Sequence, residues 1–194
     1  RKRSPDHQCY DEGYAINIPM KYCAFLRGVN VNGTSMKMAE VIKVFSDAGM
    51  KDVSTVLASG NILFSSEKKP SELKIILEKA MSHYFEYEAF LFLKNQDEIA
   101  EILNNNPFKK TDDLHIYVFV GTEGSENILL EEFTNAKKAA NEKAEIVANT
   151  FYWQVPKGNT LDSSFGKILG KKQLKDKISS RNINTFDKIF IKLK

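Results

Sequence analysis

Two short stretches of the chain place polar side chains beside glycines, each at one end of an apolar run. Arginine offers a planar fork of donors that matches phosphate or carboxylate, and asparagine and serine supply both donors and acceptors. Glycine lets the backbone take a positive φ and turn its N–H groups toward a ligand. The six residues that carry these groups are Arg27, Gly28, Asn30, Ser59, Gly60 and Asn61. Their chemistry predicts a site for an anionic ligand.

A purely structural interpretation of these residues stays open. Asn-Gly and Ser-Gly-Asn are common turn sequences, and an arginine at the end of a strand can hold loops together by donating hydrogen bonds to carbonyl groups. The glycine spacing matches neither the dinucleotide-binding fingerprint nor the phosphate-binding P-loop. The identity of any cofactor is therefore unknown from the sequence.

A second polar cluster lies near the C-terminal end. Arg181 and Asn182 come just before Thr185, where a short stretch with helical apolar spacing begins, and we expect Asn184 to cap that helix. The start of a helix suits an anion because its N–H groups are unpaired and its dipole is positive. An ordinary turn into the helix explains the same residues.

Positive charge is concentrated in the same region. The net charge is +3, yet residues 157–194 hold ten Lys or Arg against three Asp or Glu. These side chains could face the phosphates of a small molecule or a nucleic acid, or could be solvated lysines on helix surfaces. Phe151-Tyr152-Trp153 fits a core better than an RNA-stacking surface, because Asn61-Ile62-Leu63-Phe64 lacks the basic and aromatic pattern of an RNA recognition motif.

The composition gives little sign of metal, disulfide or nucleophilic chemistry. Cys9 and Cys23 are too few for a disulfide framework in 194 residues, which favours a reducing, cytoplasmic setting. The three histidines are too scattered to predict a metal site, and no motif combines a nucleophile with a base. No apolar run is long enough to span a membrane, so we expect no membrane partner.

The first part of the chain alternates between the apolar periods of strands and helices. Strands are predicted at 21–26, 53–58, 61–65 and 88–93, and helices at 35–48 with Ser35 as N-cap, 70–84 and 96–103. The order β-α-β-β-α-β is that of the split βαβ, or ferredoxin-like, arrangement. In that arrangement the first strand pairs antiparallel with the third, so Arg27 should lie beside Asn61.

The pattern then repeats without a closing strand. Strands are predicted at 114–120, 144–148 and 151–155, and helices at 128–138, 161–169 and 185–193. The fold class is therefore α+β, with two related ferredoxin-like halves, the second incomplete and closed by a C-terminal helix. Residues 1–19 are interpreted as a non-native or disordered extension, 20–106 as the first half with a linking helix, and 107–194 as the second half with basic C-terminal helices.

Four ordered motifs between Lys21 and about Leu193 resemble a mostly bacterial family known only as a domain of unknown function. They are Leu26-Arg27-Gly28-Val29-Asn30-Val31-Asn32-Gly33, Met38-Ala39-Glu40-Val41, Ser59-Gly60-Asn61 and Arg181-Asn182-Ile183-Asn184-Thr185. Asn32 stands where the family has a glycine, and Ile183 where it has a tryptophan. The resemblance implies a two-part α+β fold and places residues 1–19 outside it, but it carries no established activity.

Three functions follow from these observations. The favoured one is binding of an anionic or phosphorylated small molecule by Arg27, Ser59, Asn61 and the Arg181 cluster. A nucleic-acid-binding module is the first alternative, because of the lysines in 157–194. An enzyme with an unrecognised site for a phosphate-bearing substrate is the second, although no general base can be identified.

Overall fold

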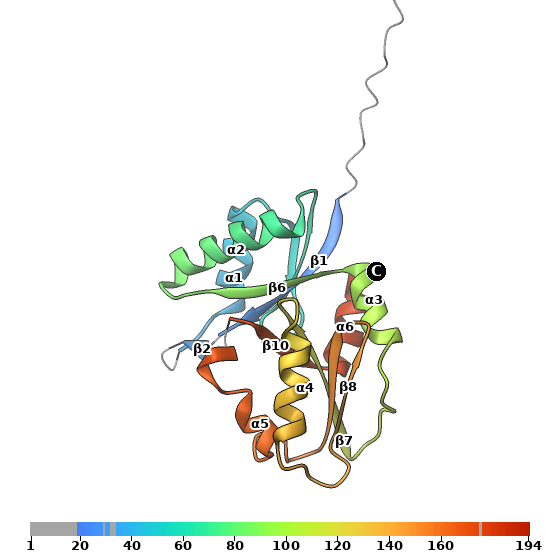
Figure 1. Cartoon of the computed structure of the whole chain (residues 1–194). Helices are drawn as coiled ribbons and strands as arrows, with labels where there is room; N and C mark the ends of the chain where they lie inside the picture. The colour runs from blue at the N-terminus through green and yellow to red at the C-terminus, as the bar shows by residue number, and fades with distance from the viewer. Residues whose placement is uncertain (1–18, 29, 32–33, 175) are drawn as a thin grey trace, which may run out of the picture.

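The chain folds into two halves of the same topology, in the computed structural model that describes residues 19–28, 30–31, 34–174 and 176–194 (Figure 1). The expected extension therefore lies, apart from Pro19, outside the described residues. No helix within these ranges is long and apolar enough to cross a membrane.

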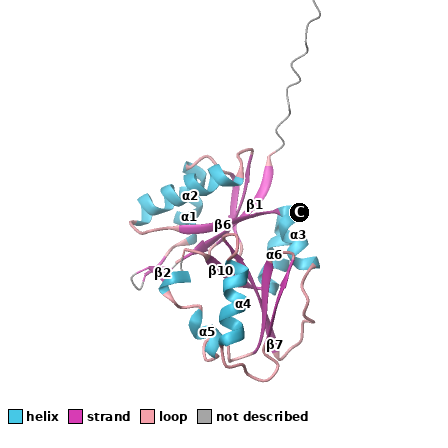
Figure 2. Ribbon diagram, in the orientation of Figure 1, coloured by secondary structure: helices cyan, strands magenta, loops and turns pink. Residues whose placement is uncertain are grey.

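The first half is a four-stranded antiparallel sheet with the order β4-β5-β1-β6. Its strands are β1 (Met20–Arg27), β4 (Lys51–Thr55), β5 (Asn61–Ser66) and β6 (Phe90–Asn95). Helices α1 (Met38–Asp47) and α2 (Pro70–Phe85) connect them (Figure 2). This is the strand order of the predicted split βαβ arrangement.

Alternating side chains of β1 supply two different cores, because successive residues of a strand face opposite sides of the sheet. Tyr22, Ala24 and Leu26 pack with α1 and α2 on the outer face. Cys23 and Phe25 pack on the inner face, which is turned toward the second half. A strand buried on both faces has an unbroken apolar sequence, as this one has.

The second half repeats this topology with the sheet order β10-β7-β9-β8. Its strands are β7 (Leu114–Gly121), β8 (Lys143–Val147), β9 (Thr150–Pro156) and β10 (Ile178–Asn182). Its helical segments are α4 (Ser125–Asn135), α5 (Ser164–Ile168), the short η1 (Lys172–Leu174) and α6 (Ile183–Leu193). The α+β class, the two related halves and the terminal helix are confirmed.

The strand β10 differs from the prediction, which left the second half without a closing strand. Ile178 is the only aliphatic or aromatic side chain in Ile178–Asn182, so the segment has no apolar alternation to detect. It nevertheless pairs antiparallel with β7, from Ile178 opposite Gly121 to Asn182 opposite Tyr117. The second sheet is therefore complete, and α6 is an addition to it.

Two helix starts also differ from prediction. Thr34–Ser35 forms strand β3, which pairs with β2 (Asn30–Val31), so Ser35 is not the cap of α1, which begins after Lys37. At α6 the N-cap is Asn182 and not Asn184, because Asn182 Oδ1 accepts a hydrogen bond from the backbone N–H of Asn184. In both cases strand pairing extends the preceding segment further than the local sequence indicates.

The two halves share one core built around α3 (Gln96–Asn104) and α6. Both helices pack against the inner faces of the two sheets, while α4 and α5 cover the outer face of the second sheet (Figure 1). Phe186 of α6 stacks on Phe25 with ring centroids 5.2 Å apart. Tyr152 of β9 donates a hydrogen bond of 2.8 Å to the Ile102 carbonyl of α3. The relative position of the halves is thus fixed by a continuous apolar contact.

We expect Phe186→Ala to destabilise the protein by about 3–5 kcal/mol, because Phe186 is fully buried and its removal leaves a cavity between the halves. Ile191→Ala on the same helix is the control; this side chain is 71% exposed and its loss should change stability by less than about 0.5 kcal/mol. Urea unfolding of both variants measures the difference. Equal losses would contradict a core shared through α6.

Candidate functional site

The two glycine-containing stretches meet at one end of the first sheet. Phe25 of β1 lies opposite Asn61 of β5, and the backbone N–H of Leu26 donates a hydrogen bond of 2.8 Å to the Gly60 carbonyl. The predicted pairing of the two stretches is confirmed, but the residue opposite Asn61 is Phe25 and not Arg27. Arg27 continues the alternation of Cys23 and Phe25, so it emerges on the inner face of the sheet.

Arg181 of β10 reaches across to this point from the second half. Its Nε donates a hydrogen bond of 2.7 Å to Asn61 Oδ1. Its Nη2 donates to the carbonyls of Leu26 and Ser59, at 2.8 and 2.9 Å. One guanidinium therefore holds the end of β1, the turn before β5 and the first residue of β5.

The remaining nitrogen of Arg181 bonds within its own strand. Nη1 donates to Ser179 Oγ and to the Ser180 carbonyl, both at 2.8 Å, and the guanidinium carbon lies 5.9 Å from the centre of the Phe25 ring. All three nitrogens thus have protein acceptors. The structural interpretation of the sequence was that an arginine at the end of a strand holds loops together through carbonyl groups. Arg181 does this, but it comes from the other half of the chain.

Asn61 is fully buried, and every polar atom of its side chain has a partner. Its Oδ1 accepts from Arg181, and its Nδ2 donates to the Val56 carbonyl and to Ser59 Oγ, each at 2.9 Å. Such complete pairing is what a buried amide requires, because an unpaired polar group in the interior costs about 1–3 kcal/mol. Asn61 acts as a structural bridge within the cluster.

The guanidinium of Arg27 makes fewer hydrogen bonds among the described residues than that of Arg181 does. Its Nη2 donates to the Leu169 carbonyl, just after α5, over a long 3.4 Å. Gly28 follows with φ +74°, and a Cβ added there would lie 3.7 Å from Cε2 of Tyr87. Gly60 also has a positive φ of 74°. We call Arg27, Gly28, Ser59 and Gly60, backed by Asn61 and Arg181, the arginine rim.

The two arginines carry positive charge without acidic partners. Burial lowers the pKa of Arg181 to about 10, and the nearby charge of Arg27 acts in the same direction. Burial also lowers the pKa of Arg27. Over the described part of the chain neither guanidinium forms an ion pair with a carboxylate. Carbonyl dipoles satisfy their hydrogen bonds but leave the charge in place, which favours a bound anion.

Asn182 does not join this cluster, and nothing places the side chain of Asn30. The backbone of Asn30 belongs to β2, and its side chain lies outside the described structure. Asn182 follows Arg181 in β10 and contacts different partners: it caps α6, and its Nδ2 lies 3.2 Å from His115 Nδ1. The alternation of a strand separates the two neighbours, and recognising β10 in the sequence would have predicted this.

Two cavities elsewhere are lined by both positive and negative side chains. A cavity of about 380 Å³ beside Asn182 is lined by Lys110, Lys157, His115 and Asp112, and Lys110 forms an ion pair with Asp187. Its positive groups are therefore partly neutralised.

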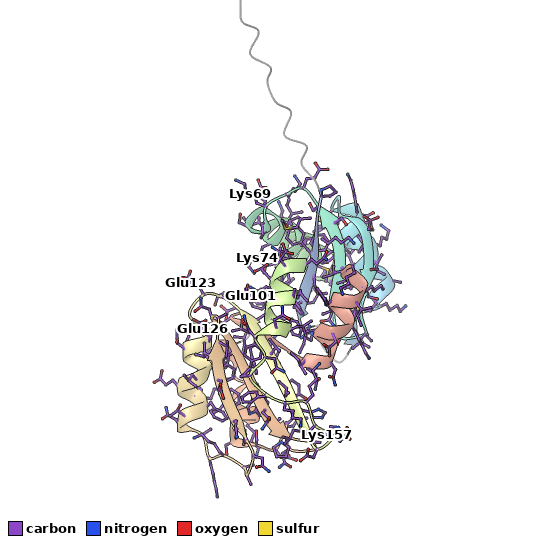
Figure 3. All side chains as sticks on the ribbon, turned by 90° about the vertical axis from the view of Figure 1, so that its right-hand side faces the viewer. Lys69, Lys74, Glu101, Glu123, Glu126 and Lys157 are labelled. Carbon is purple, nitrogen blue, oxygen red and sulfur yellow. The ribbon has the colours of Figure 1, made fainter. Side chains whose placement is uncertain are left out.

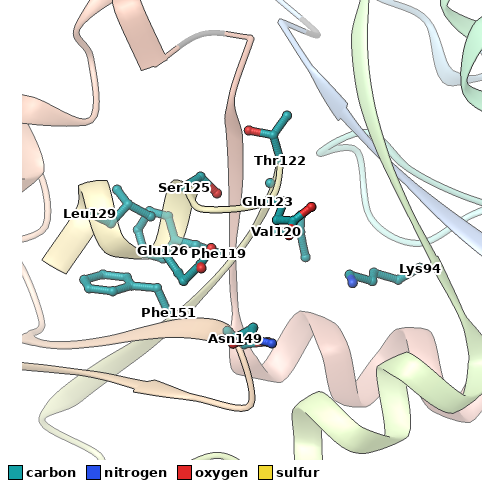
Figure 4. A pocket seen from close by; sticks show the side chains of 12 residues that line it. Lys94, Phe119, Val120, Thr122, Glu123, Ser125, Glu126, Leu129, Asn149 and Phe151 are labelled. Carbon is teal, nitrogen blue, oxygen red and sulfur yellow. The ribbon is translucent and has the colours of Figure 1, made fainter.

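The other cavity, of about 350 Å³, lies between β6 and the start of α4 (Figure 4). Lys94 faces it together with Glu123 and Glu126, but Lys94 is paired with Glu98 at 2.8 Å. Within the described ranges no three His, Cys, Asp or Glu side chains gather as a metal site would require. The arginine rim is the best candidate for binding an anion.

Arg181→Lys should destabilise the protein by about 2–3 kcal/mol, because a lysine cannot reproduce the fork of hydrogen bonds to both halves. Arg27→Lys makes the same chemical change at a residue with one long bond, and we expect a loss of less than about 1 kcal/mol. Urea unfolding of the pair isolates the effect of the fork. A similar loss in both variants would show that Arg181 does not hold the halves together.

His115 should make stability depend on pH. Burial and the charge of Lys157 lower its pKa below 6.5, so the unfolded chain binds a proton more readily than the folded one. Stability is therefore lost as the pH falls from about 7 through the folded-state pKa. Asn182→Asp keeps a capping oxygen but offers His115 a carboxylate, which should raise the pKa of His115 and weaken this loss of stability at low pH.

NMR titration of His115 and urea unfolding at about pH 5.5 and 7.5 measure both effects. An unchanged pKa of His115 in the Asn182→Asp variant would contradict the contact between the two side chains.

Comparison with known proteins gives a family and a fold. Residues 20–152 match the family model described as "Protein of unknown function (DUF1697)". No match was found among curated protein sequences. The structure of the conserved bacterial protein SP0830 from Streptococcus pneumoniae is similar with a TM-score of 0.74 at 23% sequence identity, covering 91% of this chain and 100% of that one. At this identity the likeness concerns the fold. Because the family model spans more than half of its length, the chain belongs to the DUF1697 family of proteins of unknown function.

Proposed function

We propose that the protein binds an anionic, phosphorylated small molecule at the arginine rim. The observation that supports this most directly is the pair of partly buried guanidinium groups, each without a carboxylate partner among the described residues. Leaving charge uncompensated in a desolvated place is costly, and a bound anion removes that cost.

The two arginines have different parts in this proposal. Arg181 uses its donors on protein acceptors and contributes its charge. Among the described residues Arg27 has one long hydrogen bond, to Leu169, so we assign the rest of its fork to a ligand. Gly28 and Gly60 both have a positive φ, which glycine adopts without strain, and Gly28 adds no side chain to the rim.

Binding fits the rim better than catalysis does. The side chains that contact one another there are arginine, asparagine and serine, and within the described structure none of their hydrogen-bond partners is a His, Asp or Glu side chain. A general base must lie within hydrogen-bond reach of the proton that it removes. The rim therefore offers means to hold an anion but none to transfer a proton.

A nucleic-acid interface is less well supported, because the C-terminal cations are dispersed. Lys171 forms an ion pair with Glu132, and Lys192 donates to the Thr55 carbonyl. Figure 3 shows Lys157 at the far end of the second half from Lys69 and Lys74. A nucleic acid is bound along a continuous basic surface, and Lys171 and Lys192 already have protein partners.

A thermal-shift and calorimetric screen with inorganic phosphate, pyrophosphate and sugar phosphates at low salt tests the proposal. At least one should stabilise the wild type, by about 2.7 kcal/mol at a concentration of 100 times Kd. Arg27→Ala should weaken binding about tenfold or more, since hydrogen bonds to charged groups contribute about 1.5–3 kcal/mol. Lys79→Ala removes the same charge from an exposed position of α2 and should have little effect.

The proposal would be overturned if no phosphate compound stabilised the protein. It would equally be overturned if Arg27→Ala and Lys79→Ala reduced affinity to the same extent, because the effect would then reflect net charge alone.

A further inference from the structure

A chain of hydrogen bonds fixes the direction of every donor behind the rim. Nε of Arg181 can only donate, so the atom of Asn61 that lies 2.7 Å away must be the amide oxygen. The amide nitrogen of Asn61 therefore faces the Val56 carbonyl and Ser59 Oγ, each at 2.9 Å. The orientation of a buried amide, which is normally ambiguous, is determined here by its neighbours.

The same chain determines what Ser59 can do. Ser59 Oγ accepts a hydrogen bond from Asn61, so its own hydrogen cannot point toward that amide. Ser59 is exposed at the rim, next to the carbonyl groups of Leu26 and Gly60 that surround Arg181. Its hydroxyl hydrogen therefore points away from Asn61, and because Ser59 is exposed this hydrogen can be donated to a ligand.

We infer that the arginine rim selects a doubly charged phosphate monoester, with Ser59 as a specificity-determining contact set by Asn61 and Arg181. This inference rests on the proposed function and narrows its ligand class. Arg27 can only donate, and the exposed hydroxyl of Ser59 has a hydrogen to donate, so both favour oxygens that carry negative charge. A phosphate monoester dianion has three such oxygens.

The charge of the rim leads to the same class of ligand. Arg181 cannot bond the ligand strongly, since its nitrogens are occupied, but its charge adds to that of Arg27. A dianion compensates two positive charges, whereas a phosphodiester carries only one negative charge. The rim should therefore discriminate between a terminal phosphate and the backbone of a nucleic acid.

Methyl phosphate and dimethyl phosphate are the probes that separate these ligands. At about pH 8 and low salt, calorimetry should show methyl phosphate bound at least about tenfold more tightly than dimethyl phosphate, because at that pH the monoester is fully ionised. Equal affinities would overturn the inference and favour recognition of phosphodiesters.

Ser59→Ala should weaken methyl phosphate binding about tenfold, the usual effect of losing one hydrogen bond to a charged group. Ser59→Thr keeps the hydroxyl and should bind within about threefold of the wild type. Ser71→Ala, at an exposed position of α2, is the control and should change nothing. Unchanged binding in Ser59→Ala, or a loss in Ser59→Thr as large as in Ser59→Ala, would overturn the role of the hydroxyl.

The affinity for methyl phosphate measured at several pH values tests the inference independently of any structural effect of the variants. Arg27, Arg181, Cys23 and Tyr87 are the titratable groups near the rim, and burial raises the pKa of Cys23 and takes that of Tyr87 to about 12. None of them titrates between pH 5 and 8. Methyl phosphate binding should weaken as the ligand gains a proton near pH 6, whereas sulfate binding should stay constant. Constant affinity for both would overturn the selection for a dianion.

The results also separate this inference from the proposed function. If Arg27→Ala abolishes binding while Ser59→Ala leaves it unchanged, the protein binds anions at the rim but the inference about Ser59 is wrong. If Arg27→Ala has no effect on any of the probes, the proposed function itself is wrong.

Discussion

The guanidinium of Arg181 is the contact on which the arrangement of the rim depends. It comes from an edge strand of the second sheet and donates to the end of β1, the turn before β5 and the buried amide of Asn61. The shared core around α6 brings the two halves together, but apolar packing alone does not define the direction of polar groups. The hydrogen bonds of Arg181 fix the direction of these polar groups, because each nitrogen of the planar guanidinium has its own acceptors.

Much of the architecture follows from local sequence pattern. Short apolar runs and turn residues predicted β1, β4 and β5 of the first half, and Pro70 marked the start of α2 as observed. β10 was missed because Ile178 is its one apolar side chain, and the buried residue that follows it, Ser179, is polar. A strand that is covered by a polar contact with a distant segment leaves no periodic signal in its own sequence.

The candidate site was predictable in outline for the same reason. The antiparallel pairing of β1 with β5 places Arg27 next to the turn at Ser59 and Gly60, and that pairing follows from the order of elements. Which arginine would use its donors on carbonyl groups could not be predicted, because it depends on how the second sheet docks on the first. That Arg181 and Asn182 contact different partners could not be predicted either, because it follows from their both belonging to strand β10.

Arg181 bonds carbonyl groups and an asparagine, where a carboxylate could have joined the halves equally well. The choice of uncharged partners has a functional consequence. An arginine paired with aspartate would have joined the same segments, but the pair would be neutral and would offer nothing to an anion. Carbonyl oxygens and an asparagine satisfy the same donors through dipoles and leave the full charge of Arg181 at the rim. The charge of Arg181 acts together with that of Arg27, whose fork makes one long bond, to Leu169, among the described residues. Arg181 can therefore both join the two halves and attract an anion, because its hydrogen-bond partners are uncharged.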